Sequence, residues 1–152
     1  MSPFAVDIRP RYGEVDSMGV VYHAQHLVYF DLGRTEYMRA QGLPYAALED
    51  MGFLLAVVDA SVQYRRPARY DEELSLEVTV TDLRAATVTF GYALRGRDGD
   101  LRATGSTRLG CLTRSMRPTR LPPEALDALG RGRSEAAAPS EQPQDPSRES
   151  AP

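Results

Sequence analysis

The sequence predicts an α+β domain in which a five-stranded antiparallel sheet wraps around one long central helix. Two observations lead to this prediction. Residues 23–41 read as one helical segment whose apolar side chains do not keep to a narrow stripe, which is typical of an enclosed helix. Residues 53–114 contain long strand-like runs, and a shorter run precedes the helix. A sheet that curls around such a helix buries one face of each strand.

Local signals define each element in turn. Residues 4–9 partly alternate and predict the first strand. The helix over 23–41 contains no proline and is closed by Gly42 and Pro44. A short helix is expected near 45–51, strands over 53–66, 73–83, 87–97 and 101–114, and a final helix over 123–129. The alternation is clearest over 73–83, and an Asp-Gly pair within 97–100 is typical of a hairpin turn.

Composition excludes several classes of protein. The net charge of −3 gives no electrostatic basis for nucleic-acid binding. The lone Cys111 cannot form an intramolecular disulfide and is expected to pack as a small buried hydrophobe. No apolar run approaches the roughly 20 residues of a membrane span, and residues 1–7 lack the pattern of a signal peptide. We therefore expect a cytoplasmic protein.

The last part of the chain differs from the rest. Residues 131–152 are rich in Pro, Ser and Glu and contain no aliphatic side chain larger than Ala. Such a segment cannot bury enough apolar surface to offset the entropy lost on ordering. The sequence therefore predicts one domain over residues 1–130 and a disordered tail over 131–152.

Residues 12–36 are the most informative segment for chemistry. Asp16 lies in a turn that leads through Gly19 into the predicted helix, and Gly19 indicates a backbone position with positive φ. Val21 and Tyr22 are poor N-caps, so the first N–H groups of the helix are expected to be free for a ligand. An acid beside a free helix N-terminus suits attack on a carbonyl. The acid supplies or activates the nucleophile, and the N–H groups receive the negative charge.

This segment resembles the signature of the hotdog-fold acyl-CoA thioesterases. The resemblance rests on the run from Asp16 to His23, on Tyr29-Phe30 and on Arg34–Glu36. The most similar branch is the 4-hydroxybenzoyl-CoA thioesterase-like group, including the enzymes associated with the bacterial Tol-Pal system. Residues 62–71 are similar to that family's second strand and following turn.

The resemblance implies a hotdog fold, a homodimer or homotetramer, and hydrolysis of acyl-CoA thioesters without a metal or bound cofactor. It implies that Asp16 is the catalytic acid and that the amide at or next to His23 polarises the thioester oxygen. The family usually has Asn and Tyr where this chain has Gln25 and His26, positions that shape the acyl pocket.

The candidate substrate-binding residues are Gly19, Val21, Tyr22, Arg65 and Arg66. Arginine forks suit the phosphates of CoA, and solvated charges at a strand end are the alternative interpretation of the two arginines.

The sequence leaves alternatives open at the site. Asp16 is also a typical cap or turn residue. His23 and His26 have a spacing compatible with a shared metal, but no third ligand is suggested nearby except Asp16. Two other functions fit the same pattern: a hotdog hydratase or dehydratase acting on acyl thioesters, and a non-catalytic module that binds an acyl thioester or an acyl-carrier protein.

Overall fold

The computed structural model describes residues 3–131 and 133. The elements are β1 (Ala5–Ile8), the 3-10 helix η1 (Tyr12–Glu14), α1 (Gln25–Ala40), α2 (Tyr45–Asp50), β2 (Phe53–Tyr64), β3 (Leu74–Leu83), β4 (Thr87–Arg95), β5 (Leu101–Thr113) and α3 (Pro123–Arg131). Almost all of the predicted tail lies outside the described residues. Arg131, its first predicted residue, is the last residue of α3.

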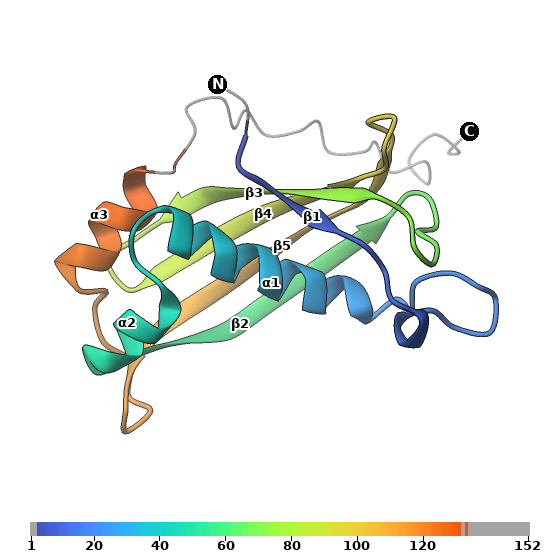
Figure 1. The fold of residues 1–152 in the computed structure, drawn as a ribbon. Coiled ribbons are helices and arrows are strands. Elements are labelled where there is room, and N and C mark those ends of the chain that lie inside the picture. The colour runs from blue at the N-terminus through green and yellow to red at the C-terminus, as the bar shows by residue number, and fades with distance from the viewer. Residues whose placement is uncertain (1–2, 132, 134–152) are drawn as a thin grey trace, which may run out of the picture.

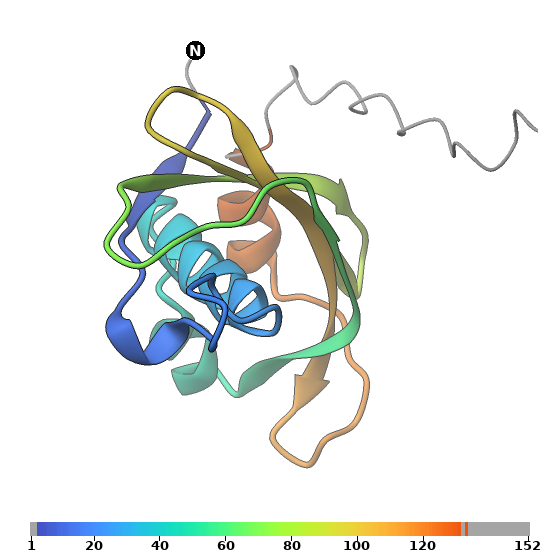
Figure 2. The same cartoon turned by 90° about the vertical axis from the view of Figure 1, so that its right-hand side faces the viewer.

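The strands form one sheet in the order β1-β3-β4-β5-β2, with every neighbouring pair antiparallel. The sheet curves around α1, and α3 lies against the same side (Figures 1 and 2). The α+β class and the five-stranded antiparallel sheet are therefore confirmed. No helix in the described part of the chain is long and apolar enough to cross a membrane.

The inner face of the sheet follows the predicted alternation. In β3, Leu74, Leu76, Val78 and Val80 are buried, whereas the residues between them are partly exposed. Burying such side chains contributes roughly 1.5–3 kcal/mol each. The β4–β5 hairpin turns at Gly99, whose φ of 83° agrees with the Asp-Gly signal.

Helix α1 is less enclosed than its composition predicted. Its buried side faces the sheet, where Phe30 stacks on Tyr92 with ring centroids 4.3 Å apart. Leu27, Val28 and Leu32 are exposed on the other side. The prediction of full enclosure is wrong for a single chain, because the sheet covers only one side of the helix.

The helix also begins later than predicted. His23 and Ala24 form a turn in which the Gln25 amide donates to the Tyr22 carbonyl (2.9 Å), and α1 starts at Gln25. This turn places the end of the signature segment just ahead of the helix rather than within it.

Candidate active site

Asp16 closes a tight turn. Its Oδ1 atom accepts hydrogen bonds from the Met18 amide (2.8 Å) and the Val20 amide (3.5 Å), and its own amide donates to the Val20 carbonyl (2.8 Å). Gly19 has the predicted positive φ, at 77°. Asp16 therefore does stabilise the turn, as the alternative interpretation held, but it uses only the Oδ1 atom of its carboxylate for this. No hydrogen bond to Oδ2 occurs within the described part of the chain, so this oxygen is available for chemistry.

The start of α1 is uncapped, as the sequence predicted. Ala24 precedes the helix and makes no side-chain cap bond. Among residues 3–131, neither the His23 amide nor the Ala24 amide donates to a protein acceptor. Such N–H groups at a helix start are suited to bind an anion or a developing oxyanion.

A cavity of about 320 Å³ brings the predicted residues together. Its wall includes Asp16, Val21, His23, Arg65 and Arg66, which come from the first turn of the signature, the start of α1 and the segment after β2. The sequence predicted these five residues from two separate motifs. Their convergence on one cavity makes it the candidate active site.

Two predicted substrate-binding residues do not line this cavity. Gly19 lies in the Asp16 turn and shapes it through its backbone. Tyr22 is 48% exposed, its ring lies tilted against that of His23 with centroids 4.3 Å apart, and its amide donates to the Glu14 carbonyl (2.9 Å).

The wall of the cavity also includes Tyr64, which the sequence did not single out, and His26, which it marked as a position that shapes the acyl pocket. Tyr64 donates its hydroxyl to the His23 carbonyl (2.7 Å), and the His26 Nδ1 atom lies 3.1 Å from the same oxygen. Because a carbonyl only accepts, His26 must carry its proton on Nδ1 when neutral. Both side chains thereby fix the peptide group that precedes Ala24. Tyr64 lies 41 residues from His23, so no local signal marks it.

Glu14 joins the segment before α1 to the first turns of the helix. Its carboxylate accepts hydrogen bonds from the Arg11 amide (2.8 Å), the Tyr29 hydroxyl (3.0 Å) and the Gln25 side chain (3.2 Å). Partial burial alone raises the pKa of Glu14, but the bonds from Arg11 and Tyr29 outweigh it and hold the pKa below its usual value. The Gln25 contact shows that this departure from the family pattern has a structural partner.

Metal ligation finds no support in the side-chain arrangement. Within residues 3–131 and 133, no three His, Cys, Asp or Glu side chains are grouped so that they could hold a metal ion.

We expect stability to fall on mild acidification because of His26. The residue is 4% exposed, and burial lowers the pKa of its imidazole below the ordinary value of about 6.5. Above that value both folded and unfolded chains hold a neutral ring. As the pH falls through it, the unfolded chain binds a proton that the folded chain resists, so the free energy of unfolding decreases.

Urea denaturation at pH 7.5 and 5.5 measures this effect. The His26→Gln variant should lose less stability than the wild type between these two values. Equal losses in the two proteins would show that another group dominates the dependence.

Comparisons with known proteins agree with this geometry. The sequence model of one protein family, the thioesterase-like superfamily, matches residues 10–129 of this chain. The putative acyl-CoA thioesterase YneP of Bacillus subtilis is 35% identical over 102 residues, which are 66% of this chain and 74% of that protein. The acyl-CoA thioesterase YbgC of Haemophilus influenzae is 29% identical over 128 residues, or 83% and 93% of the two chains.

A solved structure gives the same result for the fold. The DHNA-CoA thioesterase from Staphylococcus aureus superposes with a TM-score of 0.80 at 30% identity, covering 84% of this chain and 88% of that one. The predicted family, hotdog fold and enzyme class are therefore confirmed: the chain is a hydrolase that belongs to the thioesterase-like superfamily.

Proposed function

We propose that the protein hydrolyses acyl-CoA thioesters to a free acid and CoA, with Asp16 as nucleophile or general base. The observation that carries this proposal is the cavity lined by both Asp16 and His23, the residue just ahead of the uncapped start of α1. The similarity to YneP and YbgC, both named acyl-CoA thioesterases, supports the choice of substrate.

Two routes use the same geometry. In the first, the free Oδ2 of Asp16 attacks the thioester carbon, the carbon–sulfur bond breaks and CoA leaves as a thiolate, after which water cleaves the mixed anhydride. In the second, Oδ2 takes a proton from water, which attacks the carbonyl carbon as hydroxide; the carbon–sulfur bond then breaks and the CoA thiolate leaves, taking up the proton that Asp16 had accepted. The bond from Met18 to Oδ1 orients the carboxylate in both routes.

The amides at the start of α1 are the proposed oxyanion donors. The N–H groups of His23 and Ala24 have no acceptor among the described residues, so they can bind the carbonyl oxygen of the substrate. Donors of this kind contribute about 3–4 kcal/mol to transition-state stabilisation. Tyr64 and His26 hold the adjoining His23 carbonyl and thereby keep the turn in place.

The basic end of the cavity is the proposed site for CoA. Arg65 and Arg66 line it, and their amides both donate to the Arg102 carbonyl, at 2.8 and 3.1 Å. Their backbone is therefore fixed while their guanidinium groups can contact phosphates. Val21 contributes the apolar surface beside them.

Release of CoA tests the function directly. Purified protein should release free thiol from at least one member of a panel of short-chain, long-chain and aromatic acyl-CoAs. An altered acyl chain with the thioester intact would instead indicate a hydratase or dehydratase. Saturable acyl-CoA binding without any release would indicate the binding-module alternative.

We also propose that two or four copies of the chain form the working enzyme. Strand β2 is an edge strand of 12 residues, and Val57 and Val58 on it are exposed, as are Val28 and Leu32 on α1. An edge strand with an apolar surface favours pairing with a second copy. Light scattering should give the mass of a homodimer or homotetramer; a monomer at micromolar concentration would contradict this proposal.

The cytoplasmic location of the protein stays a prediction from its sequence.

A further inference from the structure

Residues 65–73 connect β2 to β3, and the first part of this connection lines the candidate active site. Arg65, Arg66, Pro67 and Ala68 all line the cavity. Arg102, the second residue of β5, contacts three of them in succession. Its carbonyl accepts the Arg65 and Arg66 amides, and its Nη1 donates to the Pro67 carbonyl (2.9 Å).

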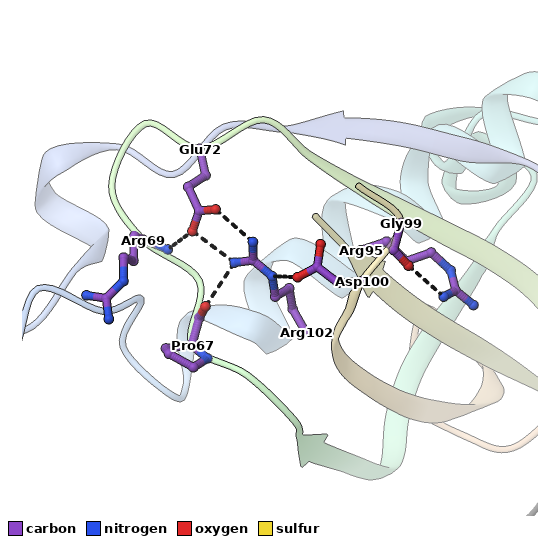
Figure 3. Close-up of polar contacts among 7 residues, drawn as sticks. All are labelled: Pro67, Arg69, Glu72, Arg95, Gly99, Asp100 and Arg102. Atoms are coloured by element: carbon purple, nitrogen blue, oxygen red, sulfur yellow. Dashed lines mark hydrogen bonds and ion pairs between the residues drawn. The ribbon is translucent and has the colours of Figure 1, made fainter. Parts of the chain in front are cut away.

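The Arg102 side chain also holds the far end of the connection. Its guanidinium forms a two-pronged contact with Glu72, with Nη1 donating to Oε1 (2.9 Å) and Nη2 to Oε2 (2.8 Å), while Nε donates to Asp100 (2.6 Å). Figure 3 shows the guanidinium between these two carboxylates. The side chain is only 13% exposed. A Cβ at Gly96 would lie 2.6 Å from Nη2, so the glycine leaves room for this arrangement.

Glu72 links the Arg102 guanidinium to the backbone of Arg69, next to the residues that line the cavity. Its Oε1 also accepts the Arg69 amide at 2.7 Å, as Figure 3 shows. The hydrogen bond from Arg102 lowers the pKa of Glu72, so the carboxylate stays charged at neutral pH. The Arg102 guanidinium therefore holds both ends of residues 67–69: it bonds the Pro67 carbonyl directly and the Arg69 amide through Glu72.

This short segment backs the Asp16 turn. The Ala68 carbonyl accepts the Val21 amide at 2.7 Å, and Val20 pairs with Arg69 in an isolated antiparallel bridge. The Val20 carbonyl in turn accepts the Asp16 amide. A continuous series of hydrogen bonds thus joins the Arg102 side chain to the turn that carries the proposed catalytic carboxylate.

We propose that Arg102 is a positioning residue, whose side chain fixes residues 67–69 so that they hold the Asp16 turn beside the start of α1. This inference rests on the proposed function. The fork geometry of Arg matters because one guanidinium serves two carboxylates and a carbonyl at the same time, which a Lys ammonium cannot reproduce with the same orientation.

The expected kinetic effect separates kcat from KM. The Arg102 carbonyl is present in every variant, so Arg65 and Arg66 stay fixed and the CoA contacts persist. Arg102→Gln should therefore lower kcat by about tenfold, since small displacements of a reacting group are costly, and change KM by less than about twofold on the same grounds. The kcat of Arg102→Lys should lie between those of the wild type and the Gln variant.

Arg95→Gln is the matched control. Arg95 also contacts a carboxylate, with Nε 3.0 Å from Glu77 Oε1, and a loop carbonyl, with Nη1 3.2 Å from the Gly99 oxygen. It makes no hydrogen bond or ion pair with residues 65–72 in the described part of the chain. The control should keep kcat. Equal kcat losses in the two variants, or a raised KM with unchanged kcat in Arg102→Gln, would overturn the proposal.

Hydrogen exchange gives a readout that needs no turnover. The Val21 amide should exchange faster in Arg102→Gln than in the wild type and at the wild-type rate in Arg95→Gln, because only the first change loosens its Ala68 acceptor. Unchanged Val21 exchange in Arg102→Gln would overturn the positioning role. A wild-type protein that releases no CoA would instead overturn the proposed function.

Discussion

Replacing Asp16 with Asn should lower kcat by about 10²-fold or more, the usual contribution of a catalytic acid or base, while leaving the fold intact. The amide oxygen of Asn can still accept the bonds from the Met18 and Val20 amides, so the turn survives. What the variant loses is the negative charge on the free oxygen. An amide neither attacks a thioester nor takes a proton from water. The thiol-release assay measures kcat, and urea denaturation checks the fold.

Two further variants sharpen this test. Asp16→Ala removes the turn acceptor as well as the charge, so it should lose at least as much kcat and also some stability. Asp98→Asn removes an exposed carboxylate from the β4–β5 turn and should leave kcat unchanged. An Asp16→Asn protein that turns over at a rate near that of the wild type would refute the assignment of Asp16.

Replacing Gly105 with Ala should destabilise the protein by about 3 kcal/mol, the upper end of the usual cost of overpacking. A Cβ at this position of β5 would lie 2.4 Å from Phe30 Cε2 and 2.5 Å from the Ser61 carbonyl oxygen. Neither neighbour can move easily. Phe30 is fully buried and stacked on Tyr92, and Ser61 belongs to the paired strand β2. Thermal unfolding should show a Tm lower by about 10 °C.

Gly110 provides a control on the same strand. A Cβ there would meet only Val58 Cγ1, at 3.7 Å, which is an ordinary van der Waals distance. Gly110→Ala should therefore change stability by no more than about 0.5 kcal/mol. If both variants lost equal stability at the same protein concentration, the close approach of α1 to β5 would not be the cause.

The sequence predicted the helices and strands with small errors at their ends. The strands were found because alternation is local: Leu74 and Leu76 point to one face wherever the strand lies. The start of α1 was placed two residues early, because His23 and Ala24 have no feature that separates a turn from a first helical residue. Asp16 and Arg65 were found through family motifs, and only the fold placed them in one cavity.

What the sequence by itself determined is therefore local: the α+β elements, the turn at Gly19, the uncapped helix start and the family signature. What only the tertiary structure decided is which distant residues meet. The bond from Tyr64 to the His23 carbonyl spans 41 positions and that from Arg102 to the Pro67 carbonyl spans 35. Such contacts depend on strand register and on the curvature of the sheet, since a shift of one residue turns a side chain to the opposite face. Tyr22, inside the signature, does not line the cavity, whereas Tyr64 and His26 form part of its wall.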